Sequence, residues 1–343
     1  MNLNKILPKI QLTRAQIHLT NRCNLRCKFC EVPTKFVNTE DLPDEKWIEI
    51  VNELSELKTK EITISGGGEP TLRFNLLIKI LEITRKNNIK TGIITNGTQV
   101  SKKYARMIVE LQPDEWRTSI CSPDRKIDAY LRGRDMSEKS FKGISYIAEW
   151  KKKKGSELPK LEVWMVQTKY NIDSIESMIK KAYSVGANSL SIRMVNPPNS
   201  PLYPTKEQRK KLVEKMEEYK KYAEKLGLEL KFHFQPADIL STSQSKVNNV
   251  KEDESTCNLI CMIPFHEIVI FADGRVAVCC NFIAYPENSE VIEDVKKKSI
   301  REIWFGRKFN KLRERILNGN PPDRCRECTP DFKSVDREYK NED

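Results

Sequence analysis

Six short β-rich runs alternate with helical patterns between residue 15 and about residue 230, and this alternation limits the folds that the chain can adopt. Parallel neighbouring strands need a crossover helix between them, so strict alternation predicts a parallel sheet. We predict an α/β fold, a partial (β/α)6 TIM-like barrel with its chemistry at the carboxyl ends of the strands. The predicted strands are Ala15–Thr20, Glu61–Ser65, Thr91–Thr95, Glu115–Ile120, Leu161–Gln167 and Ser189–Val195.

The helices between these strands are amphipathic and carry start and stop signals. After Pro43, the apolar residues Trp47, Ile50 and Leu54 recur at helical spacing and define one buried face. A longer helix over residues 206–226 is expected to end at Gly227.

The last third of the chain has a different pattern. Residues 237–256 are polar and lack periodicity, which is typical of a linker or loop. A hairpin of Glu267–Phe271 and Arg275–Cys280 and two short helices are predicted beyond them. The predicted organisation is a barrel (1–235), a linker (236–256), a small α+β domain (257–330) and a charged tail (331–343).

Composition narrows the class of protein. The chain has 343 residues, of which 38% are hydrophobic and 31% charged, as in ordinary globular proteins. It has no run of about 18 apolar residues and no apolar start, so we expect a cytoplasmic protein without a membrane span. The net charge of +12 would suit an anionic substrate, an acidic redox partner or nucleic acid. Interspersed Lys and Glu favour solvated helix faces instead.

Ten cysteines are many for a cytoplasmic chain, where thiols serve metal binding or catalysis more often than disulfides. Three of them lie within residues 23–30, six lie beyond residue 256, and only Cys121 lies between. This distribution predicts two separate thiolate sites.

The first site is Cys23, Cys27 and Cys30, directly after the first predicted strand. Soft thiolates are the ligands of iron–sulfur clusters, and three of them leave one iron of a cubane open. An open iron can chelate a cofactor, whereas a fully ligated cluster only passes electrons. The alternative is zinc, which prefers four protein ligands in a structural role, and no fourth ligand lies nearby in the sequence.

The C-x3-C-x2-C spacing, with an aromatic residue before the last cysteine, resembles the radical S-adenosylmethionine (SAM) superfamily. The resemblance implies a [4Fe–4S] cluster whose open iron binds the amino and carboxylate groups of SAM. It further implies reductive cleavage of SAM to methionine and a 5′-deoxyadenosyl radical.

Other motifs occur in the order that this resemblance implies. The segment 66–70 resembles the family's GGE motif, so Gly67 and Gly68 are expected to let the backbone approach SAM. Glu69 is expected to accept a hydrogen bond from the ammonium group of SAM. The Thr-Asn-Gly run over 95–97 matches a motif often seen after the third strand.

Four further positions come from the resemblance or from strand position. Ser119 matches a serine after the fourth strand, but Cys121 stands where the family commonly has aspartate. Arg132 resembles the arginine that pairs with the SAM carboxylate, with Arg134 as a competitor. Arg193, on the sixth strand, is a further candidate for cofactor binding if it points into the barrel.

The C-terminal cysteines have a second pattern. Cys261 and Cys279 flank Gly274 with C-x12-G-x4-C spacing, which resembles the opening of SPASM and twitch domains. Cys325 and Cys328 follow, and no cysteine comes after them. The resemblance implies the shorter twitch form, with one auxiliary [4Fe–4S] cluster on these four cysteines.

The roles of two further cysteines, and the identity of the bound metal, have alternative interpretations in this part of the chain. Cys257 lies too early for the spacing, and Cys280 would face away from its neighbour on a strand, so both are expected to be packing thiols. A zinc ribbon is the alternative for the whole set, since C-x2-C pairs commonly form one.

The leading hypothesis is a radical SAM oxidoreductase. It predicts a two-electron oxidation of a polar small molecule such as a sugar or cyclitol, with the auxiliary cluster as electron acceptor. A flavodoxin- or ferredoxin-type reductant is the expected electron donor.

Three alternatives accompany this hypothesis. A radical SAM epimerase would use Cys121 as hydrogen-atom donor, with Cys257 second, although a buried thiol without a function is the simpler interpretation. A peptide maturase would act on a peptide substrate instead of a small molecule. A zinc-containing nucleic-acid-binding protein ranks last, because the chain has no interleaved basic and aromatic patch.

Overall fold

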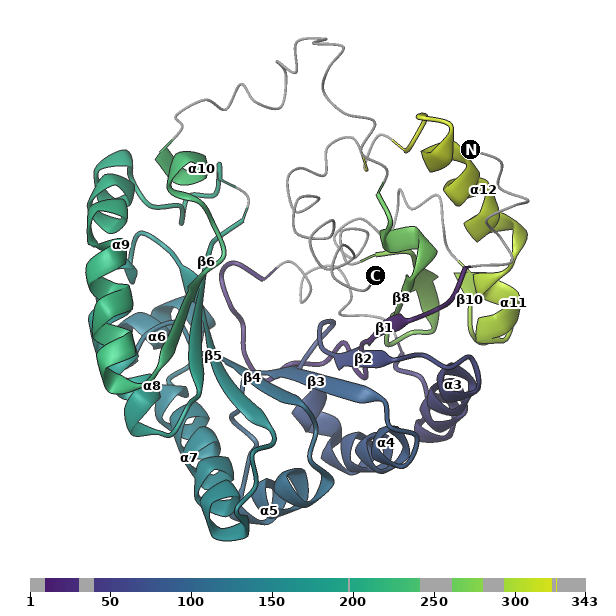
Figure 1. Ribbon diagram of the computed structural model, residues 1–343, viewed down its shortest axis with the longest axis horizontal. Helices are drawn as coiled ribbons and strands as arrows, with labels where there is room; N and C mark the ends of the chain where they lie inside the picture. Colours follow the sequence, from purple (N-terminus) through teal and green to yellow (C-terminus); the bar gives the residue numbers. More distant parts are fainter. Residues whose placement is uncertain are drawn as a thin grey trace.

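The computed structural model describes residues 10–30, 40–196, 198–240, 261–279, 293–322 and 325. Within them, strands and helices alternate along the chain, and the helices cover one face of a curved sheet (Figure 1). The face that these helices leave uncovered is called the inner face below. The parallel strands are β1 (Arg14–Ile17), β2 (Glu61–Ile64), β3 (Lys90–Thr95), β4 (Glu115–Ser119), β5 (Lys160–Gln167), β6 (Ser189–Met194) and β7 (Glu229–Phe232).

The helices that connect these strands follow the predicted order. They are α3 (Asp44–Glu56), α4 (Phe74–Lys86), α5 (Lys102–Leu111), α6 (Arg125–Arg132), α7 (Ser137–Lys154), α8 (Ile175–Ser184) and α9 (Lys206–Leu226). Short 3-10 helices precede α4 (η2, Pro70–Arg73) and α8 (η3, Ile172–Ser174). The predicted parallel α/β barrel is therefore confirmed.

Successive side chains along each strand point to opposite faces of the sheet. In β5, Val163 and Met165 are buried beneath the helices, whereas Glu162 and Trp164 are only partly buried on the inner face. Apolar stripes on the helices cover the other side, as with Trp47 and Ile50 of α3. The inner face consequently carries partly buried polar side chains such as Glu162.

One parallel strand of the barrel was not predicted from the sequence. β7 comes directly after Gly227, which ends α9 in the left-handed conformation, and it pairs in parallel with β6. Only four residues long, β7 lies at the sheet edge, so it has too few residues for a clear alternating pattern.

The C-terminal part is joined to the barrel through the same sheet. The remaining elements are η5 (Ile263–Phe265), β8 (Glu267–Ile270), β9 (Arg275–Ala277), β10 (Glu293–Asp294), α11 (Ile300–Trp304) and α12 (Arg307–Leu317). β8 pairs in parallel with β1, and β9 pairs antiparallel with β8, so that the strand order is β10-β9-β8-β1-β2-β3-β4-β5-β6-β7.

A second contact ties the C-terminal part to the barrel helices. The carboxylate of Glu53 on α3 accepts a 2.6 Å hydrogen bond from the backbone N–H of Ile300, the first residue of α11. A helix N-terminus favours a nearby carboxylate because its first N–H groups lack partners within the helix. The auxiliary part is therefore packed on the first strand and helix of the barrel.

Part of the predicted linker is helical. Pro236–Leu240 forms α10, and residues 241–256 lie outside the described residues. The charged tail predicted for 331–343 also lies outside them. None of the described helices is long and apolar enough to cross a membrane.

Candidate active site

The first cysteine set lies on the segment that follows β1, at the carboxyl ends of the strands. Cys23, Cys27 and Cys30 are each partly buried, and the backbone N–H of Leu25 contacts the Cys23 sulfur at 3.4 Å. Burial, and after it the nearby Cys30 thiol, raises the pKa of Cys27 to about 12. A bound metal would have to displace this proton, as metal–thiolate binding does in general.

The turn after β2 supports one side of this cysteine loop. The backbone N–H of Gly68 donates to the carbonyl of Thr20 at 2.7 Å, and that of Glu69 donates to the carbonyl of Arg22 at 2.8 Å. A Cβ atom at Gly68 would lie 2.0 Å from the Arg22 carbonyl oxygen. Gly68 is therefore needed for close approach to the cysteine loop, and its expected approach to SAM stays a prediction. Gly67 likewise has a positive φ of 65° and faces the Thr20 carbonyl.

The C-terminal end of α6 supports the other side. The N–H of Arg26 donates to the Arg132 carbonyl at 3.0 Å, and the N–H of Lys28 donates to the Leu131 carbonyl at 2.9 Å. Gly133, at φ 79°, ends α6 where a Cβ atom would lie 2.8 Å from the Arg26 carbonyl. The cysteine loop is thus bound between two glycine-containing turns.

Glu69 has a different set of partners from the one expected. Its buried carboxylate accepts from the backbone N–H groups of Thr71 (3.0 Å) and Asn96 (2.6 Å) and from the hydroxyl groups of Thr71 and Thr95. Burial raises the pKa of this carboxyl group despite these donors. Glu69 therefore joins the β2 and β3 turns, and its expected contact with the ammonium group of SAM stays a prediction.

The Thr-Asn-Gly turn after β3 contacts the cysteine loop directly. The Asn96 side-chain amide donates to Asn24 at 2.8 Å, and the Asn24 amide donates to the Thr98 hydroxyl at 2.8 Å. This turn was predicted from the sequence, but Asn24 was not, because it lies inside the cysteine motif and gives no separate signal.

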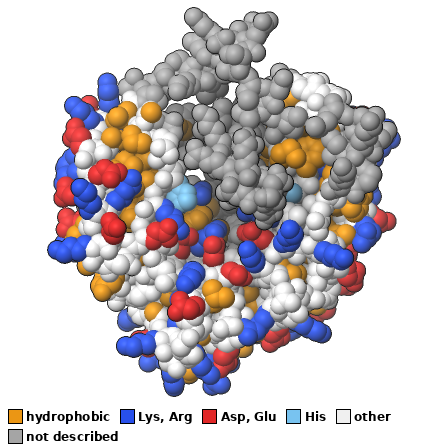
Figure 2. Space-filling model, viewed as in Figure 1, with side chains coloured by type: hydrophobic (Ala, Val, Ile, Leu, Met, Phe, Trp, Pro, Cys, Tyr) orange, Lys and Arg blue, Asp and Glu red, His pale blue; other side chains and the backbone are white. Residues whose placement is uncertain are grey.

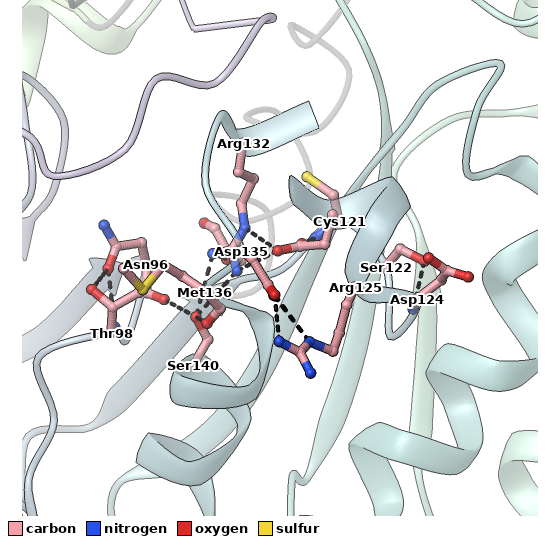
Figure 3. A network of polar contacts seen from close by, with 12 residues as sticks. Asn96, Thr98, Cys121, Ser122, Asp124, Arg125, Arg132, Asp135, Met136 and Ser140 are labelled. Carbon is pink, nitrogen blue, oxygen red and sulfur yellow. Dashed lines mark hydrogen bonds and ion pairs between the residues drawn. The ribbon is translucent and has the colours of Figure 1, made fainter. Parts of the chain in front are cut away.

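Arg132 is buried in an ion pair (Figure 3). Its guanidinium lies 2.7 Å from the Asp128 carboxylate and also donates to the Ser119 carbonyl and the Ser140 hydroxyl. Ser140 in turn donates to the Asn96 carbonyl at 2.7 Å. The guanidinium thus has a buried protein carboxylate as partner, and its expected pairing with the SAM carboxylate stays a prediction.

Cys121 lies at the carboxyl end of β4 and is buried, with 2% of its surface exposed. Its backbone N–H donates to Asp128 at 3.0 Å, and its carbonyl accepts from the Asn171 side chain at 2.7 Å. Burial raises the pKa of its thiol well above the ordinary value, so the thiol keeps its S–H proton at neutral pH. Asp128 and Asn171 were not identified from the sequence, although Asp128 and Arg132 have the i, i+4 spacing of a helical ion pair.

Ser119 and Arg193 lie on the inner face. Ser119 pairs in register with Trp164 of β5, and Val166 of the same strand pairs with Arg193 of β6. The Arg193 guanidinium lies over the Trp164 ring at 4.6 Å and is exposed. Arg193 therefore points into the barrel, as its candidate role in the sequence analysis required.

Orphaned polar atoms next to the triglycine turn fit a polar cofactor. The Nδ1 atom of His18 and the hydroxyl of Ser65 are both buried without a hydrogen-bond partner. Burial lowers the pKa of His18 to about 3, so its ring is neutral. A Cβ atom at Gly66 would lie 2.4 Å from the His18 ring, so this turn must stay free of side chains. SAM, with its amino, carboxylate and ribose groups, is a ligand of the required chemistry.

The structure describes three of the four cysteines that were predicted to hold the auxiliary cluster. Cys261 precedes η5, Cys279 follows β9 and Cys325 follows α12, and each is partly buried. Cys328, Cys257 and Cys280 lie outside the described residues. Among the residues that the structure does describe, no three His, Cys, Asp or Glu side chains converge as they would around one metal ion.

A buried arginine holds the helices beside this second set. Arg313 of α12 donates to the carbonyls of Pro264 (2.8 Å) and Trp304 (2.7 Å), and its guanidinium lies over the Trp304 ring at 4.2 Å. Burial lowers its pKa to about 9. Pro264 lies in η5, three positions after Cys261, so Arg313 fixes the segment that leads away from this cysteine.

Two curated proteins illustrate the similarity of this chain to others in sequence. An uncharacterised protein of Methanocaldococcus jannaschii is 29% identical over 219 residues, which cover 62% of this chain and 70% of that protein. A probable GTP 3′,8-cyclase of Sulfurisphaera tokodaii is 27% identical over 265 residues, covering 77% of this chain and 80% of that protein.

Solved structures agree with the fold. SuiB of Streptococcus suis bound to S-adenosylmethionine superposes with a TM-score of 0.66 at 18% identity, covering 90% of this chain and 68% of SuiB. The protein anSMEcpe with bound AdoMet gives a TM-score of 0.63 at 17% identity, covering 87% of this chain and 82% of that protein.

Family models match both cysteine-containing parts. Residues 17–182 match the model of the radical SAM superfamily, and residues 261–329 match that of SPASM, an iron–sulfur cluster-binding domain. These matches confirm the predicted cofactor classes, S-adenosylmethionine and iron–sulfur clusters, at the level of the family. The chain belongs to the radical SAM superfamily and carries a C-terminal iron–sulfur cluster-binding domain.

Proposed function

We propose that this chain is a radical SAM oxidoreductase that removes two electrons from a polar small molecule. Cys23, Cys27 and Cys30 would hold the [4Fe–4S] cluster that binds SAM. Cys261, Cys279, Cys325 and Cys328 would hold the auxiliary [4Fe–4S] cluster. When bound, these groups supply the one-electron reduction that cleaves SAM to a 5′-deoxyadenosyl radical and the acceptor for the electron that the substrate loses.

One observation carries the proposal: the cysteine loop is fixed between two turns at the carboxyl ends of the strands. Gly68 and Glu69 bind its first half, and the carbonyls of Leu131 and Arg132 bind its second half. Both turns close the barrel end at which α/β barrels place their reactive groups. This position supports a loop that carries three cluster ligands at the carboxyl ends of the strands.

The chain's own residues would orient the cofactor and exclude water. The neutral ring of His18 and the hydroxyl of Ser65 are unsatisfied donors or acceptors beside the triglycine turn, where a polar cofactor would satisfy them. Ser119 lies across the inner face at the end of β4. Glu69 and Arg132 act on the cofactor through the loops that they hold in place.

The inner face supports a polar substrate. Arg117, Glu162, Ser191 and His233 all lie on it, and they form a chain of ion pairs and hydrogen bonds. The relative described as a probable GTP 3′,8-cyclase is named for a polar, anionic small molecule. Both points favour a small polar substrate over an apolar one.

A peptide substrate is the second candidate. SuiB has been solved bound to its precursor peptide SuiA, and anSMEcpe has been solved with a bound peptide. Since both resemble this chain in fold alone, they make a peptide the competing substrate class to be tested beside small molecules.

The experiment is anaerobic reconstitution, followed by incubation with SAM and a reductant and quantification of 5′-deoxyadenosine. We expect the wild type to form it and a C23A/C27A/C30A variant to form none. A C257A variant is the matched control, because it removes a cysteine outside both proposed ligand sets. Formation of 5′-deoxyadenosine by the triple variant at the wild-type rate would contradict the proposal.

Product analysis in heavy water distinguishes the reaction types. A dehydrogenase gives an oxidised product without solvent deuterium on the reacting carbon. An epimerase that uses Cys121 as hydrogen-atom donor would place deuterium on that carbon, because the thiol exchanges with solvent. A product that carries deuterium and is not oxidised would therefore replace the oxidoreductase proposal with the epimerase.

A further inference from the structure

We propose that the inner face of β5, β6 and β7 contains a subsite for an oxyanion of the substrate, a carboxylate or a phosphate. Arg193 and His233 would be its recognition residues. The inference rests on the proposed function, since the subsite lies on the wall of the same barrel and would hold the substrate of the same reaction.

Register rows show how charge changes along this wall. In the first row, nearest the amino ends, Glu162 and Glu229 flank Ser189. The next row is Trp164, Ser191 and Lys231. Arg193 lies one row further, beside Val166. The carboxylates thus lie deeper, and the positive groups lie nearer the carboxyl ends, where the cysteine loop is placed.

The deeper carboxylates already have cationic partners. Glu162 lies 3.2 Å from Arg117 and also accepts from the Ser191 hydroxyl at 2.5 Å. Glu229 lies 2.9 Å from Lys231. Because these carboxylates are neutralised locally, they do little to repel an anion that approaches from the carboxyl ends.

Arg193 lies against an aromatic ring of the same wall. Its guanidinium lies 4.6 Å from the centre of the Trp164 ring, and that of Arg117 lies 5.2 Å from the same ring. A guanidinium over an aromatic face is attracted to the ring and keeps five N–H donors. Because Arg193 is exposed, a carboxylate or phosphate on the inner face can reach its guanidinium, which suits such anions.

His233 lies next to Arg193 on the neighbouring strand. Its backbone N–H donates to the Ile192 carbonyl at 2.9 Å, which places it directly after β7. The ring is exposed, lies 6.2 Å from the Trp164 ring and has its Nε2 atom 3.0 Å from the Ser191 hydroxyl. On the face of the molecule drawn in Figure 2, a histidine side chain lies beside Lys or Arg side chains. Since the Ser191 hydroxyl donates to Glu162, Nε2–H of His233 donates to Ser191, and only the protonated ring has a second N–H to offer an anion beside Arg193.

Binding to the reconstituted holoenzyme with SAM tests the subsite. Calorimetric titration with pyrophosphate and succinate compares phosphate with carboxylate, and myo-inositol is the neutral control. We expect one or both anions to bind, and R193Q to weaken that binding about tenfold or more, as for a lost contact to a charged group. H233Q, a second variant, is expected to weaken it less.

R106Q is the matched control variant. Arg106 is also an exposed arginine over a tryptophan, at 5.8 Å from Trp150, but it lies on α5 outside the barrel. Anion binding equal to wild type in R106Q supports the subsite. The proposal is overturned if neither anion binds better than myo-inositol, if R193Q and R106Q behave alike, or if R193Q weakens SAM binding instead of anion binding.

The two proposals fail in different ways. A wild type that binds the anions through Arg193 but yields no 5′-deoxyadenosine contradicts the proposed function and leaves the anion subsite standing. A wild type that cleaves SAM but binds no anion contradicts only the subsite.

Discussion

Asp128 and Arg132 form a buried ion pair across one turn of α6, with 2.7 Å between carboxylate and guanidinium. The same carboxylate accepts from the backbone N–H of Cys121, and the carbonyl of Arg132 accepts from Arg26 in the cysteine loop. One ion pair therefore connects the end of β4 with the segment that would hold the first cluster. Its removal should affect both.

The first prediction concerns this ion pair. Asp128→Asn leaves the Arg132 charge buried without its counter-charge, which typically costs about 3–5 kcal/mol. We expect the free energy of unfolding in urea to fall by about that amount and iron retention after reconstitution to fall with it. Asp135→Asn is the control, because the Asp135–Arg125 pair is exposed and its loss should leave both readouts unchanged. Equal stability of the two variants would contradict the role of the buried pair.

Gly68→Ala should disrupt the cysteine loop without adding a large side chain. The new Cβ atom would lie 2.0 Å from a backbone carbonyl that cannot move without moving the loop. We expect formation of 5′-deoxyadenosine to fall by about tenfold or more, equivalent to about 1.4 kcal/mol. Gly92→Ala is the control, since its nearest contact would be an ordinary 3.6 Å. A fully active Gly68→Ala variant would show that the two loops need not be in contact.

Acid should destabilise the folded chain through His18. Burial lowers its pKa to about 3, whereas the unfolded chain takes up a proton near pH 6.5. Stability from this group is present above pH 6.5 and is lost as pH falls, at about 1.4 kcal/mol per pH unit down to the folded pKa. His18→Leu should lose that slope between pH 6.5 and 4.5 in urea unfolding, relative to wild type. If the free energy of unfolding changes with pH equally in wild type and His18→Leu, the titration of His18 is ruled out as the cause.

Anion binding should strengthen as pH falls. Burial, then the charge of Arg193, lowers the pKa of His233, with Lys231 and Arg117 acting in the same direction and Glu162 opposing them. A bound anion favours the protonated ring, so binding takes up a proton and gains affinity toward pH 6. Sulfate is the appropriate probe because its charge is constant in this range. A His233→Asn variant should lose the pH dependence, and a pH dependence equal to wild type would exclude His233 from the subsite.

Local patterns accounted for much of the fold. Periodicity predicted β1 to β6 and the helices between them because each pattern depends on residues close in sequence. The cysteine spacings at 23–30 and 261–279 are local too, so the resemblance to a known family could be read from them directly. Four-residue β7 was missed because it is too short to have a clear period.

Contacts between distant segments could not be predicted in the same way. The pairing of Arg14 with Glu267 joins residues more than 250 positions apart, and nothing local in either strand encodes it. The partners of Glu69 and Arg132 depend on which turns meet at the barrel end. For this reason the contacts of Glu69 with Thr71, Thr95 and Asn96 and the contact of Arg132 with Asp128 could not be predicted from the sequence.

The central claim is that two clusters are bound and that only the first has an iron open to SAM. Iron content with EPR of the reduced protein, before and after addition of SAM, tests it most directly. We predict about eight irons per chain in the wild type and about four in the C261A/C279A variant, whose remaining signal changes when SAM is added. An iron-free protein that binds only zinc, or a remaining signal that SAM leaves unchanged, would contradict the claim.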